Sequence, residues 1–429
     1  MHSAQPTPVT DLPTLDDLMA FDEFSRDFVE TARELIRRDG TGLLKGPENS
    51  LVVLRNKDVR ALAANPALGN MPADVLFWMA TEMDLGSGPG VKPDPEQTAG
   101  FGQFLRNQVF TSNPPLHQPS RNILVRQLMP RKIMRFAPAA QRLAEELIEE
   151  CAGREQIDFA HEFAGRFVTR FWAEQLGLSR DQAAHVQELI EEMNLTFLLS
   201  RSPEQSQRMF SAVATYMEVV GEAVRQAWAK KDNELLLDMA ADLAAIDIEG
   251  EPEDIGTLVA ANFFDGFHTV GVAIVNVIYR LLSNEAALAQ VRADPSLVAN
   301  AFFEGTRLES PLMVSQRLAL QDVEHQGVLI PAGTPVVMVW AAANRDPEVF
   351  TDPDSYQLTR TILHGTTFGG GGHLCPGRNV ARMLTETVVT ALTAPGIDIA
   401  LVGGEPSWVP HSLMRHVTAL PVTLRRAGK

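Results

Sequence analysis

The stretch that decides the fold of this chain is residues 368–382, which read Phe-Gly-Gly-Gly-Gly-His-Leu-Cys-Pro-Gly-Arg-Asn-Val-Ala-Arg, with Cys375 near the middle. Glycine adopts backbone angles closed to other residues and lets a flat ligand approach the main chain. A helix is predicted from Arg378 onward, because no breaker follows until Pro395. The unpaired N–H groups and the positive dipole at a helix start favour a thiolate. The stretch therefore predicts a metal-ligating thiolate in a specially shaped loop.

Composition limits the class of protein. The 429 residues are 45 % apolar and 21 % charged, which is typical of a globular enzyme, and the net charge of −17 argues against nucleic acid as a partner. The two cysteines, Cys151 and Cys375, cannot form a disulfide framework and suit a reducing cytoplasm. The amino terminus lacks the order of a signal peptide, and no apolar run reaches the length of a membrane span. We expect a soluble, cytoplasmic protein with no membrane partner.

The spacing of Phe368, Gly369, His373, Cys375 and Gly377 resembles the haem-binding signature of the cytochromes P450. The resemblance implies haem b as cofactor, with the Cys375 thiolate as the axial ligand of the iron and the other four residues as haem contacts. His373 would bind a propionate. A lone thiolate, without a second cysteine or histidine at metal spacing, does not build a zinc or iron–sulfur site. The alternative of Cys375 as a hydrolase nucleophile has little support.

The resemblance also implies a fold class that is mainly α with smaller β-sheets, as one domain over residues 1–429, with a long central helix over the haem and the cysteine loop beneath it. Residues 1–15 are expected to form a flexible leader. Periodicity predicts that long helix at residues 254–282, about 43 Å in length. Further helices and strands are predicted as follows: helices at 19–38, 57–65 and 298–307, several helices between 136 and 231 with breaks near Gly153, Gly177 and Ser202-Pro203, and strands at 50–55, 312–317 and 328–340. The many glycines and prolines of residues 69–113 predict a long irregular loop with at most short helices.

The long helix carries the candidate catalytic residues Thr269, Asp265 and His268. By resemblance, Thr269 is the threonine that helps to deliver protons during oxygen activation. The sequence departs from the family pattern at two positions here. His268 stands where an acid is expected, and Asp265 stands where a small residue is usual. Asp265 and Thr269 are four apart and share a helix face. We predict that Asp265 serves in proton delivery or anchors the substrate, and that His268 carries protons; a structural aspartate within a helix kink is the alternative.

Two further clusters are predicted outside that helix. His117 and Arg121, four apart on one helix face, and Arg317 are implied by the resemblance to bind haem propionates. Glu304 and Arg307, three apart on a helix, are implied to form a buried structural cluster with Arg360. The alternative for Glu304 and Arg307 is a surface ion pair of little consequence.

The resemblance implies a substrate pocket that is apolar with one acid. Its expected lining residues are Ala261, Phe264, Leu312, Val314 and Leu413, together with Asp265 and Thr269. A medium-sized hydrophobic substrate would fit, such as a terpenoid, an aromatic compound or a polyketide-like compound with one basic or hydroxyl group.

The implied activity inserts one oxygen atom from O2 into the substrate. The chain holds no flavin or iron–sulfur motif, so electrons from NAD(P)H would arrive through ferredoxin reductase and ferredoxin. The expected docking face is formed by Arg106 or by the cations of residues 121–135, together with Arg378; a solvated helix face is the alternative for the cations of residues 121–135. Charge reversal at Arg126 or Arg131 is expected to slow reduction and to weaken its salt dependence. Two alternatives stay open: a peroxide-driven haem enzyme, which would turn over with H2O2 alone, and a haem-binding sensor without catalysis.

Overall fold

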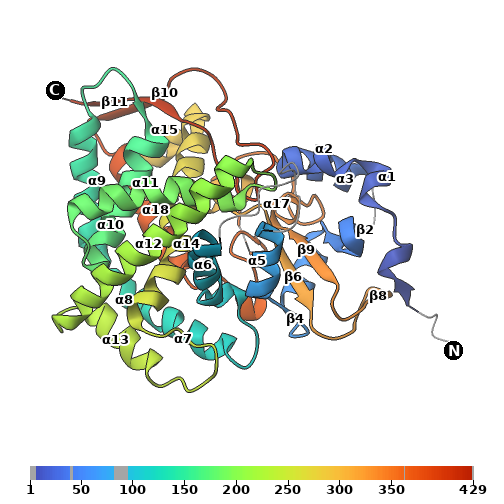
Figure 1. The fold of residues 1–429 in the computed structure, drawn as a ribbon. Helices are drawn as coiled ribbons and strands as arrows, with labels where there is room; N and C mark the ends of the chain where they lie inside the picture. Colours follow the sequence, from blue (N-terminus) through green and yellow to red (C-terminus); the bar gives the residue numbers. More distant parts are fainter. Residues whose placement is uncertain (1–5, 39–41, 82–94, 362, 428–429) are drawn as a thin grey trace. The chain divides into compact units, whose positions relative to one another are not determined.

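The structure is a computed structural model that describes residues 6–38, 42–81, 95–361 and 363–427. Its elements are labelled in Figure 1. The chain divides into two compact units. The first, here the sheet unit, comprises Met1–Met71, Thr306–Cys375 and Val409–Arg415, and the second, here the helical unit, comprises Pro72–Gly305, Pro376–Trp408 and His416–Lys429. The single-domain expectation stays a prediction.

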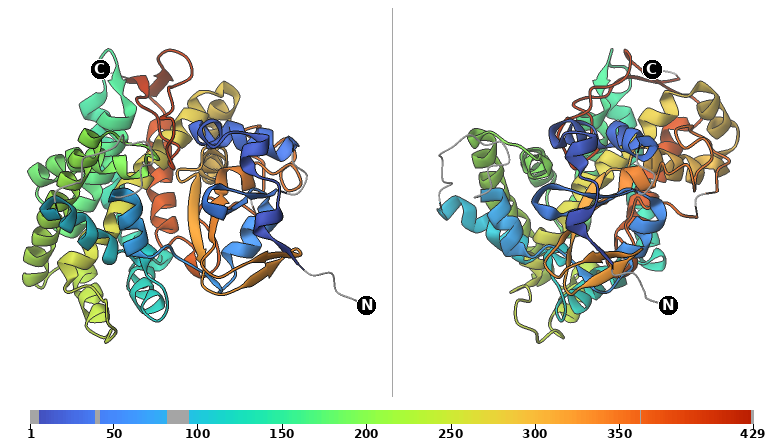
Figure 2. Two further views of the ribbon diagram at one scale, coloured as in Figure 1. Left: turned by 45° about the vertical axis from the view of Figure 1, so that its right-hand side comes forward. Right: turned by 90° about the vertical axis from the view of Figure 1, so that its right-hand side faces the viewer.

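The sheet unit is built on a five-stranded sheet with the order β2-β3-β9-β6-β4. Its strands are β2 (Leu43–Lys45), β3 (Leu51–Val53), β9 (Pro335–Val339), β6 (Val314–Ala319) and β4 (Leu68–Gly69). Both views in Figure 2 show the blue amino-terminal strands beside the orange ones, and β3 and β9 pair in parallel, with Val52 opposite Val337. The predicted strands at 50–55 and 328–340 are confirmed within their ranges, and the strand predicted at 312–317 is confirmed as β6, which extends to Ala319. They join parts of the chain that are distant in sequence.

A second, three-stranded sheet of the same unit has the order β1-β8-β7, with β1 (Thr7–Pro8), β8 (Val328–Ile330) and β7 (Val323–His325). The expectation of a flexible leader differs from the structure here. Thr7 pairs with Val328, and the buried Val9 joins the apolar core. Residues 1–5 lie outside the described residues.

The helices of the sheet unit are α1 (Leu15–Leu18), α2 (Phe21–Arg26), α3 (Phe28–Arg38), α4 (Asn56–Ala63) and α17 (Trp340–Ala343). The prediction of one helix over 19–38 is wrong, because the backbone of Asp27 is extended, with φ −149° and ψ 92°. The Asp27 carboxylate accepts from the backbone N–H groups of Val29 at 3.0 Å and Glu30 at 3.3 Å. A side chain that satisfies the first N–H groups of α3 starts a new helix there.

The helical unit is organised on α14 (Ile255–Leu282), which confirms the long helix predicted for 254–282. It packs against α10 (Arg166–Leu176), α12 (Pro203–Ala229) and α18 (Arg378–Thr393) (Figure 1). The other helices of this unit include α7 (His117–Gln127), α8 (Pro130–Ile133), α9 (Ala137–Cys151), η5 (Phe159–Gly165), α11 (Arg180–Met193), η6 (Asn194–Phe197), α13 (Glu234–Leu243) and α15 (Glu285–Ala293). α16 (Val298–Leu308) runs from this unit into the sheet unit.

In the described part of the chain, α14 alone is long and apolar enough to cross a membrane, but 78 % of its most apolar window is buried inside the protein. Burial on this scale is typical of a core helix. The predicted breaks are also confirmed. Gly177 ends α10 in the left-handed conformation with φ 82°, and Ser202 caps α12 while Pro203 occupies its first turn.

Residues 69–113 are more helical than predicted. Their described part contains α5 (Ala73–Thr81), α6 (Pro95–Arg106) and η3 (Val109–Thr111). Gly100 lies within α6, where a Cβ would lie 2.7 Å from the Cβ of Ala214 on α12. The glycine thus allows two helices to pack closely, a tertiary reason that composition does not carry. Residues 82–94 of the predicted loop lie outside the described residues.

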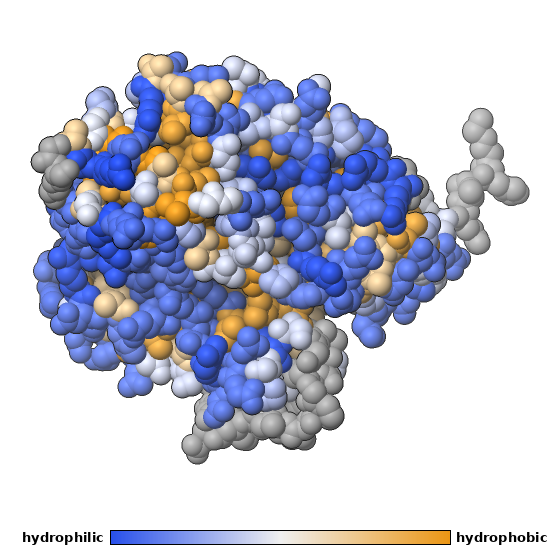
Figure 3. Space-filling view, turned by 90° about the horizontal axis from the view of Figure 1, so that it is seen from above, coloured by the Kyte–Doolittle hydropathy of each residue, from blue (hydrophilic) through white to orange (hydrophobic). Residues whose placement is uncertain are grey.

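The helical unit ends in a small sheet with the order β10-β11-β5, formed by β10 (Ile397–Leu401), β11 (Pro421–Arg426) and β5 (Ile157–Asp158). On the protein surface, Figure 3 shows one face on which polar residues predominate and apolar residues gather in patches. The large exposed apolar side chains of the described residues are Trp78, Phe110, Met129, Met134, Leu320, Leu363 and Val402.

Candidate functional site

The cysteine loop of the sheet unit is closed by backbone hydrogen bonds. The N–H of Cys375 donates to the carbonyl of Phe368 at 2.9 Å, and that of Gly369 donates to Thr366 at 2.9 Å. Gly369 and Gly371 have φ values of 71° and 61°, which favour glycine. A Cβ at Gly371 would also lie 2.4 Å from the carbonyl oxygen of Ala63 in α4. The loop therefore requires glycine for its own backbone and for its contact with α4, and it holds a half-buried thiol.

Asn344, to which the sequence assigned no role, anchors the start of this loop. Its Oδ1 accepts from the backbone N–H of Thr366 at 2.7 Å and from the Thr366 hydroxyl at 3.0 Å. Its Nδ2 donates to the hydroxyls of Ser310 at 2.8 Å and Thr367 at 3.0 Å. All four bonds of one buried amide are thus satisfied by residues that flank the loop. A pattern search does not find such a residue, because its partners lie far from it in sequence.

Arg317 on β6 shows what the sheet unit is able to bind. Its Nη1 donates to the carbonyl of Gln316 at 2.9 Å, while its Nε is buried without a partner. Burial lowers the pKa of Arg317 to about 10, and no acidic side chain in the described part of the chain pairs with it. A buried guanidinium without a counterion fits the predicted binding of a propionate. His373, on the 3₁₀ turn Gly371–His373, belongs to the same unit.

The structure also brings together the three predicted pocket residues of the sheet unit. Leu312 forms an isolated bridge with Met414, and the N–H of Met313 donates to the carbonyl of Leu413 at 2.8 Å. Val314, at the start of β6, is buried. The segment at Leu413 therefore runs beside the strand that carries Leu312 and Val314.

In the helical unit, α14 places Asp265 and Thr269 as predicted. The Thr269 hydroxyl donates to the backbone carbonyl of Asp265 at 2.5 Å. The indole N–H of Trp172 donates to the next carbonyl, that of Gly266, at 3.2 Å. Within the described residues, the Asp265 carboxylate has no hydrogen-bond partner, and the helix is continuous there. The alternative of an aspartate bonded within a helix kink is therefore not supported.

Burial shifts the pKa values of two titratable side chains on α14 in opposite directions. It raises the pKa of Asp265 from 3.8 to about 7. It lowers the pKa of His268 to about 3, with a further contribution from His416, whose ring centroid lies 5.9 Å away. A histidine with this pKa is neutral at physiological pH and holds a proton poorly. Burial thus disfavours the imidazolium form of His268, and its role as a proton carrier stays a prediction.

The remaining predicted residues of the helical unit are buried or half-buried. His117 and Arg121 both lie on α7, as expected, and Gly377 precedes the first residue of α18. The carbonyl of Ala261 accepts from the Gln108 side chain at 3.2 Å. Phe264 is the centre of an aromatic cluster that the sequence did not predict, with Phe104, Phe197 and Tyr216 at centroid distances of 5.6, 6.2 and 6.1 Å.

Glu304 and Arg307 lie on α16 and are 0 % and 1 % exposed, so the surface-pair alternative is wrong. Arg307 donates to the carbonyls of Asn344 at 2.9 Å, Pro353 at 2.6 Å and Ser355 at 3.2 Å. Arg360 donates to the same Ser355 carbonyl at 3.4 Å. The two arginines thus hold one stretch of irregular backbone within the sheet unit.

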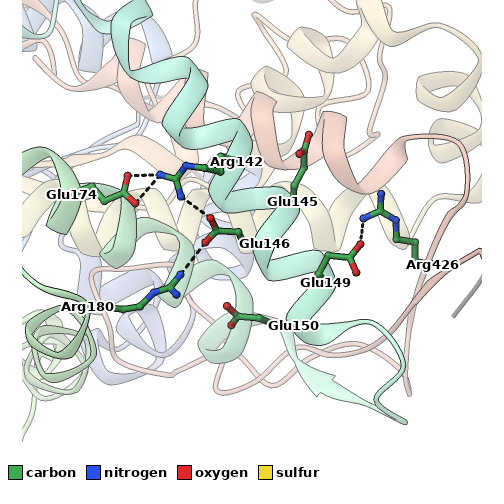
Figure 4. A pocket seen from close by; sticks show the side chains of 8 residues that line it. All are labelled: Arg142, Glu145, Glu146, Glu149, Glu150, Glu174, Arg180 and Arg426. Carbon is green, nitrogen blue, oxygen red and sulfur yellow. Dashed lines mark hydrogen bonds and ion pairs between the residues drawn. The ribbon is translucent and has the colours of Figure 1, made fainter.

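A depression of about 680 Å³ on the helical unit is lined by charged residues (Figure 4). Its three arginines are all paired with its glutamates. Arg142 binds Glu174 at 2.6 Å and Glu146 at 2.7 Å, Arg180 binds Glu146 at 2.9 Å, and Arg426 pairs with Glu149. This depression therefore has the character of a surface ion-pair network and not of an apolar substrate pocket.

The donor set of the described residues fits one kind of cofactor. No group of three or more His, Cys, Asp or Glu side chains in that part of the chain is arranged to hold a metal ion. A loop thiol, an arginine without an acidic partner among the described residues and a helix-rich fold together indicate a haem-thiolate protein.

Comparison with known proteins agrees. Residues 89–392 match the family model of Cytochrome P450, and the chain belongs to this family. The chain is 27 % identical to Cytochrome P450 107B1 of Saccharopolyspora erythraea, over 96 % of this chain and 98 % of that protein. It is 26 % identical to 6-deoxyerythronolide B hydroxylase of the same species, over 78 % of this chain and 83 % of that protein.

Among solved structures, P450BioI in complex with hexadec-9Z-enoic acid ligated Acyl Carrier Protein matches with a TM-score of 0.78 at 20 % identity, over 94 % of this chain and 100 % of that chain. This match confirms the predicted fold class. The protein is thus a bacterial cytochrome P450 monooxygenase, an oxidoreductase that binds haem iron through a cysteine thiolate.

Proposed function

We propose that this P450 inserts one oxygen atom from O2 into a medium-sized, largely apolar organic substrate. The observation that carries the proposal is the closed glycine loop that presents the Cys375 thiol. Haem, when bound through this thiolate, supplies oxygen activation. The other residues proposed to hold it are Phe368, Gly369, His373, Gly377, His117, Arg121 and Arg317. The buried, unpaired Nε of Arg317 supports an anionic partner for that side chain.

The first test of the proposal concerns the thiolate. The absorption spectrum of the reduced, carbon monoxide-bound protein is expected to show the red-shifted band of a thiolate-ligated haem. Cys375→Ser is expected to lose that band, whereas Cys151→Ser, which changes a buried cysteine in α9, is the matched control. A red-shifted band that persists in Cys375→Ser would contradict the assignment of the ligand.

Asp265 and Thr269 are proposed to handle the proton that oxygen activation requires. A carboxyl with a pKa of about 7 releases and regains a proton readily at neutral pH. The Thr269 hydroxyl, whose hydrogen is directed to the Asp265 carbonyl, keeps its oxygen lone pairs available to accept a hydrogen bond. The Asp265 carboxyl would supply the proton, and Thr269 would hold in position the group that accepts this proton.

The role of Asp265 is tested with a library compound that shifts the haem absorption band. Asp265→Asn is expected to slow its turnover and to remove the inflection of kcat near pH 7, whereas Asp265→Glu is expected to keep an inflection. Unchanged turnover, substrate affinity and pH profile in Asp265→Asn would exclude both proton delivery and substrate anchoring by this residue.

The proposed substrate pocket is lined by Ala261, Phe264, Leu312, Val314 and Leu413. The aromatic cluster around Phe264 supports a hydrophobic substrate with ring character. The names of the relatives do not select one compound. One relative is a hydroxylase of 6-deoxyerythronolide B, whereas P450BioI is solved with an acyl carrier protein that bears a fatty acid.

The electrons are proposed to come from NAD(P)H through ferredoxin reductase and ferredoxin in the cytoplasm. The predicted docking face is less positive than its sequence indicated. Arg126 pairs with Asp242 at 2.5 Å, Lys132 with Asp238 at 2.6 Å and Arg135 with Glu234 at 3.1 Å, all on or beside α13. These acids offset three of the cations of residues 121–135.

Arg131 is the residue of this face best suited to an acidic partner. It is exposed on α8, and no acidic side chain among the described residues pairs with it. Met129 and Met134, on either side of that helix, are 45 % and 62 % exposed. An exposed cation beside apolar side chains fits a small acidic electron donor.

The docking proposal is tested by measuring the rate of reduction by ferredoxin at several salt concentrations. Arg131→Gln is expected to slow reduction at low salt more than Arg126→Gln, because the charge of Arg126 is already offset by Asp242. Rates of reduction that are equal in both variants and the parent, and that do not depend on salt, would refute the proposal that ferredoxin docks on this face. Turnover with H2O2 alone at the rate reached with NADH, reductase and ferredoxin would favour the peroxide-driven alternative.

A further inference from the structure

Two polar side chains in the core of the helical unit end without a partner. The Tyr216 hydroxyl on α12 and the His268 Nε2 on α14 are buried, and neither has a hydrogen bond within the described residues. The two side chains are 0 % and 8 % exposed. Buried polar groups in native proteins are nearly always paired with protein, water or ligand. These two groups therefore call for a partner other than the described residues.

Both groups belong to one aromatic wall. The Phe264 ring lies 6.1 Å from the Tyr216 ring and 6.5 Å from the His268 ring, so it contacts both. Phe197 lies nearly parallel to Phe264 and His268, with interplanar angles of 9° and 19°. The polar atoms are thus set in a surface of ring faces and edges, a composition that binds a flat apolar skeleton.

The charge state of the two groups restricts the ligand. The pKa of His268 is lowered to about 3 and the pKa of Tyr216 is raised, in both cases chiefly by burial, so both side chains are neutral at physiological pH. The phenol and the imidazole themselves offer no full charge to a ligand; the charge that acts on Tyr216 is the carboxylate of Asp265, which the proposed function already uses. They do offer one donor and one acceptor between them, or two donors, depending on the imidazole tautomer.

A hydroxyl group satisfies either arrangement, because it donates one hydrogen bond and accepts others. We propose that Tyr216 and His268 bind a hydroxyl group of the substrate, and that this P450 therefore acts on a hydroxylated apolar compound with a ring system. This inference rests on the proposed function and names the class of its substrate. Tyr216 would donate to the hydroxyl oxygen, and His268 Nε2 would accept the hydroxyl hydrogen.

Matched probes test the inference by equilibrium binding to the holoenzyme, measured by calorimetry and by the shift of the haem absorption band. The pairs are naphthalene with 2-naphthol and phenanthrene with 9-hydroxyphenanthrene. The hydroxylated member of a pair is expected to bind roughly tenfold more tightly, as one hydrogen bond to a desolvated partner is worth about 1.4 kcal/mol. In Tyr216→Phe and in His268→Phe this preference is expected to fall several-fold, and His268→Gln, which keeps a hydrogen-bonding side chain, is expected to restore part of it.

Equal affinity for both members of every pair in the parent protein, or no hydroxylated member that binds, would overturn the inference. A preference that is unchanged in Tyr216→Phe and His268→Phe would also overturn it. Tyr216→Phe preserves the ring and its packing, so a folding failure of His268→Phe leaves a decisive variant. The carbon monoxide spectrum is recorded on each sample. Its red-shifted band in the absence of any hydroxyl preference would reject this inference alone, whereas loss of the band in the parent protein would reject the proposed function.

Discussion

The carboxyl group of Asp265 predicts how the stability of this protein changes with pH. Its pKa is about 7 in the folded protein and ordinarily 3.8. The difference between these values, at ~1.4 kcal/mol for each pH unit, means that the ionised carboxylate destabilises the folded protein by on the order of 4 kcal/mol. The folded-state pKa is the higher one. This penalty is therefore absent below about pH 4, grows as the pH rises and is complete above about pH 7.

Asp265→Asn keeps the size of the side chain and removes its titration. The variant is expected to be more stable than the parent by about 1 kcal/mol at pH 4.5 and by about 4 kcal/mol at pH 8. The assay is urea unfolding of the holoprotein between pH 4.5 and 8, followed by tryptophan fluorescence and haem absorption. Asp232→Asn, which changes an exposed carboxylate, is the matched control. A stability difference between Asp265→Asn and the parent that does not change with pH would refute the reasoning.

Three further predictions concern the cysteine loop and the backbone packed in the same unit. Gly371→Ala is expected to lower haem retention and stability, because its Cβ would lie 2.4 Å from a backbone oxygen. The control is Gly372→Ala, since a Cβ at Gly372 would have no atom within 4 Å. Equal haem content in both variants would contradict the packing argument. Asn344→Ala leaves the Thr366 N–H unpaired and is expected to cost about 2–4 kcal/mol in urea unfolding, against less than ~0.5 kcal/mol for the exposed Gln141→Ala. Arg307→Lys, which removes a fork that bonds three carbonyls, is expected to cost about 2–4 kcal/mol by the same assay; a loss below ~0.5 kcal/mol would show that these bonds contribute little.

Local sequence patterns predicted the elements whose signals lie within the element itself. The helix α14 is predominantly apolar, and α12 begins at a capping serine followed by proline. Such signals act through the backbone of neighbouring residues and need no partner from elsewhere. The same reason makes the cysteine loop recognisable, since its glycines are required by local backbone angles.

The predictions that failed depend on contacts between distant residues. Gly100 is one of the glycines of residues 69–113 that predict an irregular loop, yet it lies in α6, where Ala214 of another helix leaves no room for a Cβ. The helix predicted over residues 19–38 is divided at Asp27, whose carboxylate accepts from the first N–H groups of a new helix although the apolar residues on both sides have helical spacing. Asn344 and the aromatic cluster at Phe264 have no sequence signature, because each is defined by partners from other elements.

The sequence by itself determined the family and predicts the iron ligand, because a thiol before a helix start and the glycines around it are properties of one short stretch. Only the tertiary structure decided the chemical state of the side chains on α14. Asp265 and His268 are ordinary titratable residues in the sequence, but burial gives them pKa values of about 7 and about 3. Desolvation depends on every residue packed around a group, and those residues come from helices far apart in the chain.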